Sequence, residues 1–422
     1  MLFTLIKNEL IKILKRGKTW VVFGLFCLAM IGLVTVHKIS ANDMEHWRSP
    51  QGQIEMIDNN LKWQKEELKN STNSLNELKS KNESKDVIKS QEEHILYLKG
   101  EIKRLEDDRK IQEQLLSGEK TIDWRDSLRS DIKELKNSIN SMELHEENKA
   151  HIEDLKREIE KKQYFLDNNI KPIEQWEFYP GNLAIQGMMI LGMVILVSGI
   201  AVFMSDIVSG EFTPATVKFL LVQPISRAKV ILSKFIAVII TVVSMICGVE
   251  LATFGIVGAI TGFADLKMPV QLGVKYQINQ EVFLRDGFKQ LEKVIGSGYQ
   301  STMGDFVLKS FLLQVLFIIT CCAFIFMISA IFKSSMITMA VSVIISVSAT
   351  VLPMLSEKFS EIAQYIFLNY GNTPSIISGD IAFNYHSNIY FTPKLGIIIM
   401  IITIVISYIV SHIVFNRRDM LM

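Results

Sequence analysis

The most constraining feature of this chain is the separation of its charges into one block. Residues 41–180 carry 24 Lys and Arg and 31 Asp and Glu, which are 55 of the 89 such residues in the chain. The block therefore has a net charge of −7, the difference between the two counts. Long stretches on both sides of it lack charge, and about 20 apolar residues of helix cross a bilayer. The sequence predicts an integral membrane protein with a large water-exposed insertion.

Six stretches that lack Asp, Glu, Lys and Arg, one of them apart from Glu250, are predicted to span the membrane. They are Thr19–His37, Phe178–Ser205, Phe235–Ala264, Ser310–Phe332, Ser334–Ser356 and Leu395–Asn416. The predicted fold class is all-α, with an N-terminal interfacial helix and a long extracellular helical coiled coil between the first and second spans. The expected division is 1–16 for the interfacial helix, 17–39 for the first span, 40–180 for the coiled coil and 181–422 for the remaining five spans.

Basic residues beside the spans predict the orientation, because cytoplasmic loops carry an excess of Lys and Arg. They gather before the first span, after the second, between the fourth and fifth, and after the last. We therefore expect cytoplasmic N- and C-termini in a bacterial plasma membrane, with residues 40–180 outside. The residues concerned are Lys7, Lys12, Lys15, Arg16, Lys18, Lys218, Arg227, Lys229, Lys234, Lys333, Arg417 and Arg418.

The first fifteen residues have apolar side chains at helical spacing with lysines between them. This pattern predicts a basic amphipathic helix on the inner membrane surface. The alternative is a cytosolic extension of the first span.

Heptad spacing of apolar residues in the charged block predicts a coiled coil. The simplest arrangement is one antiparallel hairpin with its tip near Ser117–Lys120 and a bend or second turn near Ser80–Asp86. The register slips between Met142 and Ile152. A docking arm, a conduit element, a ligand sensor and a plain spacer or dimerisation stalk all remain open as roles. The seams are Ile54, Ile57, Leu61, Leu68, Leu75 and Leu78 with polar gaps, then Ile95, Leu98, Ile102 and Leu105, then Leu128, Ile132, Leu135, Ile139 and Met142, and later Ile152, Leu155 and Ile159.

The loop between the second and third spans, 204–234, reads MSDIVSGEFTPATVKFLLVQPISRAKVILSK. Thr213 is placed to cap a short helix with Pro214 in its first turn. The chain here resembles the permease subunits of ABC-2 type transporters, which have an acidic and glycine-containing loop, a short Leu-rich segment, Pro-x-Ser-Arg and a Ser-Lys pair. The six spans, the N-terminal basic helix and the ending Phe415–Asp419 agree. The matching loop residues are Asp206, Gly210, Glu211, Thr216, Leu220, Leu221, Pro224, Ser226, Arg227, Ser233 and Lys234.

This resemblance implies a dimer of permeases, either homodimer or heterodimer, each docked to a separate cytosolic ATPase subunit that binds ATP and magnesium. The coupling loop would be 205–229. The long insertion between the first two spans departs from the family pattern and leaves the substrate class open. The chain itself has no sequence pattern of a catalytic, cofactor or metal site, and no nucleic-acid partner is expected. The implied contacts with the ATPase are Asp206, Gly210, Glu211, Thr213, Thr216 and Lys218.

Glu250 is the one acidic residue inside a predicted span, and such residues are candidates for function because they are costly in lipid. Met189 and Met193 in the second span offer an adaptable wall for a substrate path. The alternatives are an interfacial carboxylate that reaches water, and methionines that pack or face lipid.

The leading hypothesis is an exporter subunit for an amphipathic cargo such as a peptide, an antibiotic or a lipid-like molecule. The alternative is a membrane-anchored tether or sensor, in which the coiled coil binds an envelope partner and nothing is transported. In the two smaller external loops, Asp286–Ile295, Glu361–Leu368 and Pro374–Ile377 are predicted to contain short helices.

Overall fold

The structure is a computed structural model that describes residues 2–121, 123–142, 149–212 and 226–417. The chain divides into two compact units. The membrane unit comprises residues 1–36, 145–154 and 178–422, and the helical unit comprises residues 37–144 and 155–177.

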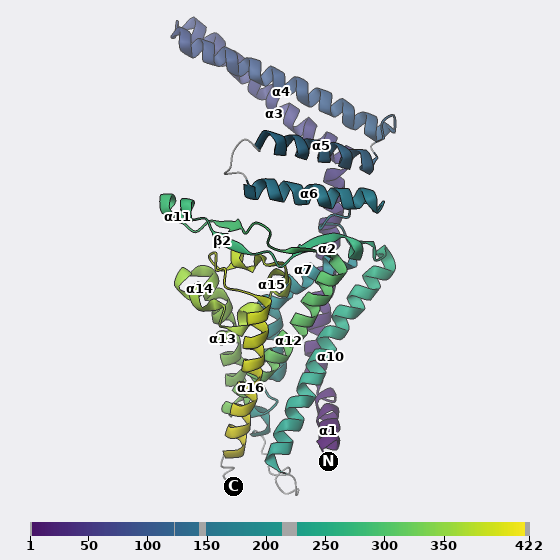
Figure 1. Ribbon diagram of the computed structural model, residues 1–422, viewed down its shortest axis with the longest axis vertical. Coiled ribbons are helices and arrows are strands. Elements are labelled where there is room, and N and C mark those ends of the chain that lie inside the picture. Colours follow the sequence, from purple (N-terminus) through teal and green to yellow (C-terminus); the bar gives the residue numbers. More distant parts are fainter. Residues whose placement is uncertain (1, 122, 143–148, 213–225, 418–422) are drawn as a thin grey trace. The chain divides into compact units, whose positions relative to one another are not determined.

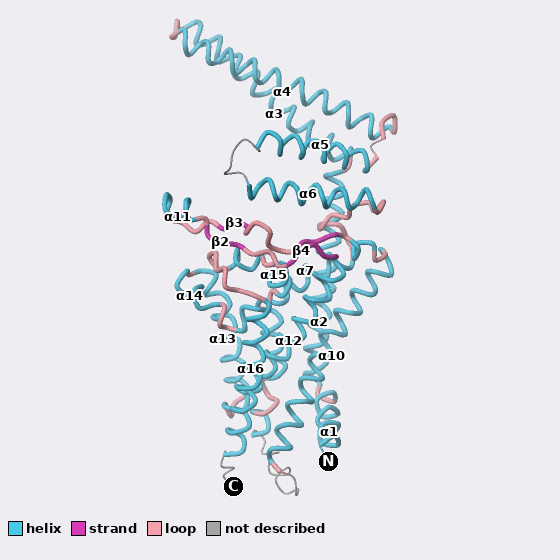
Figure 2. Tube along the Cα trace, in the orientation of Figure 1, coloured by secondary structure: helices cyan, strands magenta, loops and turns pink. Residues whose placement is uncertain are grey.

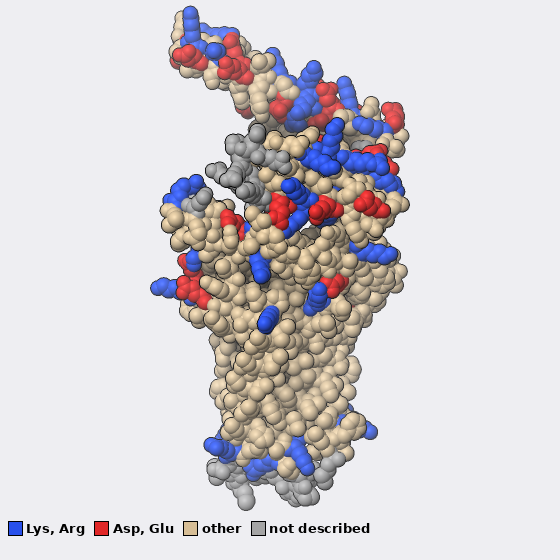
Figure 3. Space-filling model, in the orientation of Figure 1, with Lys and Arg blue, Asp and Glu red and all other residues tan. Residues whose placement is uncertain are grey.

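Among the described residues, five helices are long and apolar enough to cross a bilayer. On the face shown in Figure 3, the middle of the membrane unit is a broad belt without charged side chains, and basic side chains gather at the end that holds both termini. This pattern is that of a multi-pass membrane protein. The five helices are α2 Gly17–Arg48, α10 Arg227–Thr261, α12 Met303–Ile331, α13 Ser335–Leu355 and α16 Pro393–Arg417 (Figure 1).

The predicted second span is bent rather than straight. It consists of α7 Pro180–Met193 and α8 Ile195–Met204, whose axes differ by 61°. The described chain thus has five candidate spans, or six if this bent pair crosses the membrane once. At the bend the backbone of Gly192 lies against that of Gly371, and a Cβ on Gly192 would overlap the Gly371 carbonyl oxygen. Only glycine permits this close approach.

The core of the membrane unit is centred on α12, which contacts α7, α8, α10 and α16. Most residues in its middle are buried, because the helix is apolar on every side rather than along one stripe. The fully buried residues include Phe317, Ile318, Cys321, Cys322 and Phe326.

The N-terminal helix α1 Leu2–Leu14 packs along α10, and the prediction of a helix here is confirmed. Its apolar side chains divide between two environments. Ile6, Leu10 and Ile13 contact the protein core, whereas Phe3 and Leu14 are exposed. The helix is therefore held by protein on one side and exposes apolar side chains elsewhere; its place on the membrane surface stays a prediction.

Between α10 and α12 the chain forms two short antiparallel strand pairs that were not predicted (Figure 2). β1 pairs with β4, and β2 pairs with β3. The fold is otherwise helical. The segments are η3 Ala264–Lys267, β1 Pro269–Leu272, β2 Tyr276–Ile278, α11 Gln280–Asp286, β3 Leu291–Lys293 and β4 Tyr299–Thr302.

One of the three short helices predicted in these loops is wrong. Asp286–Ile295 contains β3 instead, because Gly287 adopts a left-handed conformation and ends α11. The helix predicted at Glu361–Leu368 lies earlier, and the one at Pro374–Ile377 is confirmed. The observed segments are α14 Glu357–Ala363, η4 Phe367–Tyr370, α15 Thr373–Ser378 and η5 Asp380–Asn384.

After the last turns of α2, the helical unit contains two antiparallel helices, α3 Pro50–Ser80 and α4 Lys85–Ser117. Lys65 lies 2.8 Å from Glu106, and Lys79 lies 2.7 Å from Glu92, which fixes the antiparallel direction. Heptad residues of α4 are buried between the helices, with Ile102 and Leu105 against Leu61. Coiled-coil geometry itself stays a prediction.

A single hairpin with its tip at Ser117–Lys120 is wrong. The chain first reverses at residues 81–84, between α3 and α4, where only a bend or second turn was predicted. The segment after α4, where the tip was predicted, leads instead to α5 Trp124–Met142. α5 is antiparallel to α6 Lys149–Asp167, with Asp131 2.7 Å from Lys162. Apolar heptads predict which faces pair, but not which of two turns reverses the chain. The predicted register slip falls partly on 143–148, outside the described residues.

Gly192→Ala is expected to lower the free energy of unfolding by roughly 1–3 kcal/mol, because the added methyl group forces the Gly371 backbone away. Unfolding of the purified protein in detergent measures this change. Gly199→Ala in α8 is the matched control, since nothing lies within 4 Å of the position its Cβ would take. Equal stability of the two variants would contradict the close backbone contact.

Candidate functional sites

Asp206 lies two residues after the end of α8 and joins the bent pair α7–α8 to the start of α2. Its Oδ1 accepts a hydrogen bond from Lys18 Nζ at 2.9 Å, and its Oδ2 lies 3.4 Å from Arg16 Nη1. Lys18 also donates to Ser205 Oγ at 3.0 Å. Arg16 lies in the joint between α1 and α2, and Lys18 lies in the first turn of α2, so the carboxylate holds this joint against the end of α8. We call Arg16, Lys18, Ser205 and Asp206 the Asp206 cluster.

The residues after Asp206 are fastened to the end of α12. The backbone N–H groups of Val208 and Ser209 both donate to Ser329 Oγ, at 3.2 Å each, and this hydroxyl donates to the carbonyl of Ser205 at 3.3 Å. Gly210 allows the tight return, because a Cβ there would lie only 3.0 Å from that of Asp206. Residues 205–210 are thus bound to both α2 and α12.

A buried ion pair holds α1 against α10 at the same end of the membrane unit. Lys234 Nζ donates to both carboxylate oxygens of Glu9 at 3.0 Å, and the Lys234 side chain is 1% exposed. A lysine buried this completely is stable as a cation only with its partner, so the pair fixes the position of α1.

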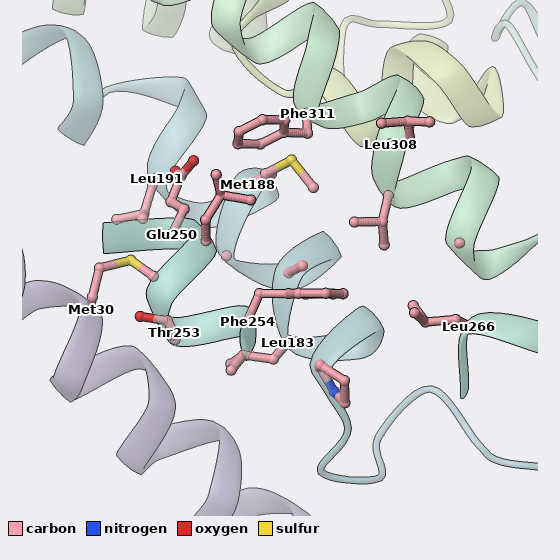
Figure 4. A pocket seen from close by; sticks show the side chains of 16 residues that line it. Met30, Leu183, Met188, Leu191, Glu250, Thr253, Phe254, Leu266, Leu308 and Phe311 are labelled. Atoms are coloured by element: carbon pink, nitrogen blue, oxygen red, sulfur yellow. The ribbon is translucent and has the colours of Figure 1, made fainter. Parts of the chain in front are cut away.

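A cavity of about 240 Å³ lies among α2, α7, α10 and α12, and Glu250 is in its wall (Figure 4). Oε1 of Glu250 accepts a hydrogen bond from Gln314 Nε2 at 2.9 Å. Oε2 is buried and has no hydrogen-bond partner among the described residues. The cavity is lined by Met30, Pro180, Leu183, Ala184, Gly187, Met188, Leu191, Glu250, Leu251, Thr253, Phe254, Leu266, Gly304, Val307, Leu308 and Phe311.

Asp265 anchors the start of α7 beside this cavity. Its Oδ2 accepts hydrogen bonds from the backbone N–H groups of Gly181 at 2.6 Å and Asn182 at 3.2 Å, which satisfies donors that the first turn leaves free. Burial raises the pKa of Asp265, and the two N–H donors oppose that rise. The carboxyl therefore fixes the helix from which six cavity residues project.

Comparison with known families gives a match over nearly the whole chain. The model of the ABC-2 family transporter protein matches residues 3–420. The chain belongs to the ABC-2 transporter family. A search of curated proteins found no match. The matched range extends across the charged insertion, which departs from the pattern of the resemblance.

The residues predicted to couple this ABC-2 permease to an ATPase are only partly within the described chain. Asp206 and Gly210 lie in the fastened segment, and the backbone of Glu211 belongs to η2 Ser209–Phe212. Thr213, Thr216 and Lys218 lie outside the described residues, and their role stays a prediction.

The substrate-path residues of the ABC-2 permease are also only partly brought together. Glu250 lines the cavity with Met188, whereas Met189 lies on α7 outside the lining. The Met193 side chain is outside the described part. Sequence reasoning missed Met30 and Gln314, although a glutamine inside an uncharged span is a usable signal.

The Glu9–Lys234 pair leads to a stability prediction for the ABC-2 permease. Lys234→Ala is expected to lower the free energy of unfolding by about 3–5 kcal/mol, because it leaves the Glu9 carboxylate largely buried without its cation. The double variant Glu9→Leu with Lys234→Met removes both charges and is expected to lose less. Unfolding in mixed detergent micelles compares the two. A double variant that is less stable than the single one would refute this assignment.

Proposed function

We propose that this chain is the membrane subunit of a bacterial ABC exporter, working as a dimer with a second permease and with a separate pair of cytosolic ATPase subunits. ATP and magnesium bind to those subunits. In this proposal both termini face the cytosol, six spans cross the plasma membrane, and the helical unit is an external coiled coil. Family membership supports the ATPase partner. The basic side chains at the end with both termini support the orientation.

The observation that carries the coupling mechanism is the attachment of residues 205–210 to two spans. The segment contacts α2 through the Asp206 cluster and α12 through Ser329. A displacement of loop 205–229 by the ATPase would therefore move these helices together. Because the Asp206 carboxylate already binds Lys18 and Arg16, we assign it to holding the loop rather than to touching the ATPase.

The proposed cargo is amphipathic, and the cavity supports this class. Its wall combines apolar side chains with one carboxylate. Such a site suits a molecule with an apolar body and a single polar group.

Asp206→Lys tests the coupling mechanism, because it places a cation beside Lys18 and Arg16. A candidate ABC ATPase subunit is coexpressed and copurified with the permease, and its ATP hydrolysis is measured with and without the permease. We expect the stimulation by the permease to fall by roughly tenfold, a usual magnitude for the loss of one coupling interaction. The double variant Asp206→Lys with Lys18→Asp restores an opposite-charge pair and is expected to recover part of the ATPase stimulation.

Glu357→Gln is the control. Glu357, the first residue of α14, is an exposed carboxylate that pairs with Lys289. This variant is expected to leave stimulation unchanged. Full stimulation in Asp206→Lys would contradict the coupling role, and failure of any ATPase to copurify with the native chain would contradict the exporter.

A second function, an envelope tether or sensor, is favoured by exposed apolar side chains on the first helix pair. Trp63, Leu96 and Tyr97 are 61%, 71% and 62% exposed. Deleting residues 50–170 separates the two functions. The exporter predicts that ATPase stimulation survives the deletion, since the Asp206 cluster lies in the membrane unit. The tether is favoured if the native chain transports nothing and the deletion abolishes its binding to an envelope partner.

A further inference from the structure

Glu250 is the one charged residue among the described residues that line the cavity. Of the sixteen described residues that line the cavity, only Glu250 and Thr253 have polar side chains. In Figure 4 the Glu250 side chain lies between Leu191 and Met188, with Phe311 nearby. The cavity thus presents one acidic group to a ligand and, apart from Thr253, is lined by apolar residues.

The two oxygens of this carboxylate differ in their hydrogen bonding. Gln314 is fully buried on α12 and donates to Oε1, which orients the carboxylate. Oε2 is buried and lacks a hydrogen-bond donor among the described residues. A buried acceptor of this kind costs free energy that a hydrogen-bonded cation would offset.

The remaining wall suits the apolar part of a cationic ligand. Phe254 and Phe311 offer aromatic faces, which attract cations as well as alkyl groups. Met30 and Met188 add flexible thioether side chains that adapt to ligand shape. A volume of about 240 Å³ holds about eight heavy atoms, at roughly the 30 Å³ that one water molecule takes in the liquid.

We propose that this cavity is a binding site for an amphiphile that carries one protonated amine, with the ammonium group on Glu250 and an alkyl segment of about eight carbons against the apolar wall. An anionic head group is excluded by repulsion from the carboxylate. A neutral hydroxyl forms only the weaker, uncharged hydrogen bond. That this ligand is also the cargo rests on the proposed export function, whereas binding itself does not.

The test uses three probes with the same chain length, octylamine, octanol and octanoate, and the full-length protein in dodecylmaltoside. Native mass spectrometry or the shift in thermal unfolding gives each dissociation constant. We expect octylamine to bind at least about tenfold more tightly than octanol, as a hydrogen bond to a charged group implies, and octanoate to bind least. Equal binding of octylamine and octanol would overturn the proposal.

Glu250→Gln is expected to weaken octylamine binding by at least about tenfold and to leave octanol binding nearly unchanged. Ala184→Leu fills the cavity and is expected to weaken both probes equally, since Ala184 is in the wall. Glu357→Gln, an exposed carboxylate outside the cavity, is the control and should change neither. If Glu250→Gln bound octylamine like the native chain, the assignment of Glu250 would be wrong. If Glu250→Gln fails to fold, the probe comparison in the native chain and Ala184→Leu still decide.

The same ammonium chemistry is offered by an exported amine and by a membrane aminophospholipid. Octylamine binding in nanodiscs of phosphatidylethanolamine and of phosphatidylcholine distinguishes these sources. Competition only from phosphatidylethanolamine supports a lipid in the site, and equal binding in both supports a transported amine. The binding assay contains no ATPase, so it is independent of the ATPase-stimulation assay. If octylamine binds but the permease does not stimulate an ATPase, only the exporter is overturned. If the permease stimulates an ATPase but octylamine does not bind, only this site is overturned.

Discussion

The ion pairs of Asp206 with Arg16 and Lys18, at the junction of α1 and α2, determine how one end of the membrane unit is held. Ion pairs near the surface contribute only about 0–1 kcal/mol each to stability. The pairs of Asp206 are partly exposed, so their main effect is to fix the position of the segment after α8 relative to α2. The hydroxyl of Ser329 and the buried Glu9–Lys234 pair complete the attachment. Together they join α1, α2, α10 and α12 around the segment that follows α8. A force on that segment therefore acts on several spans at once.

The bent pair α7–α8 connects the two candidate sites. α8 ends beside Asp206, and α7 supplies Met188 and other walls of the Glu250 cavity. The bend itself is held by the contact of Gly192 with Gly371, and the far end of α7 is fixed by Asp265. In the proposed exporter, motion at the Asp206 cluster would reach the cavity along this pair. The bend would then be part of the mechanism rather than an irregularity of packing.

The features that the sequence predicts well are those that depend on local composition. Uncharged stretches identify the spans, and heptads identify the buried faces of α3 and α4. The bend at Gly192 was not predicted, because it depends on a backbone contact with Gly371, far along the chain. Asp206 was selected through family resemblance, but its partners Arg16 and Lys18 come from another segment. Glu250 was selected as a charge within a span, whereas its hydrogen bond to Gln314 depends on the packing of α10 against α12.

In the proposed orientation the Asp206 cluster faces the cytosol and the helical unit faces outside. Single cysteines at Lys229 and at Ser117, two exposed positions, test it in a chain whose four native cysteines are replaced. Intact cells are treated with a membrane-impermeant maleimide before and after permeabilisation. We predict that the cysteine at 117 reacts in intact cells and that the one at 229 reacts only after permeabilisation. Reaction of both in intact cells would contradict the account.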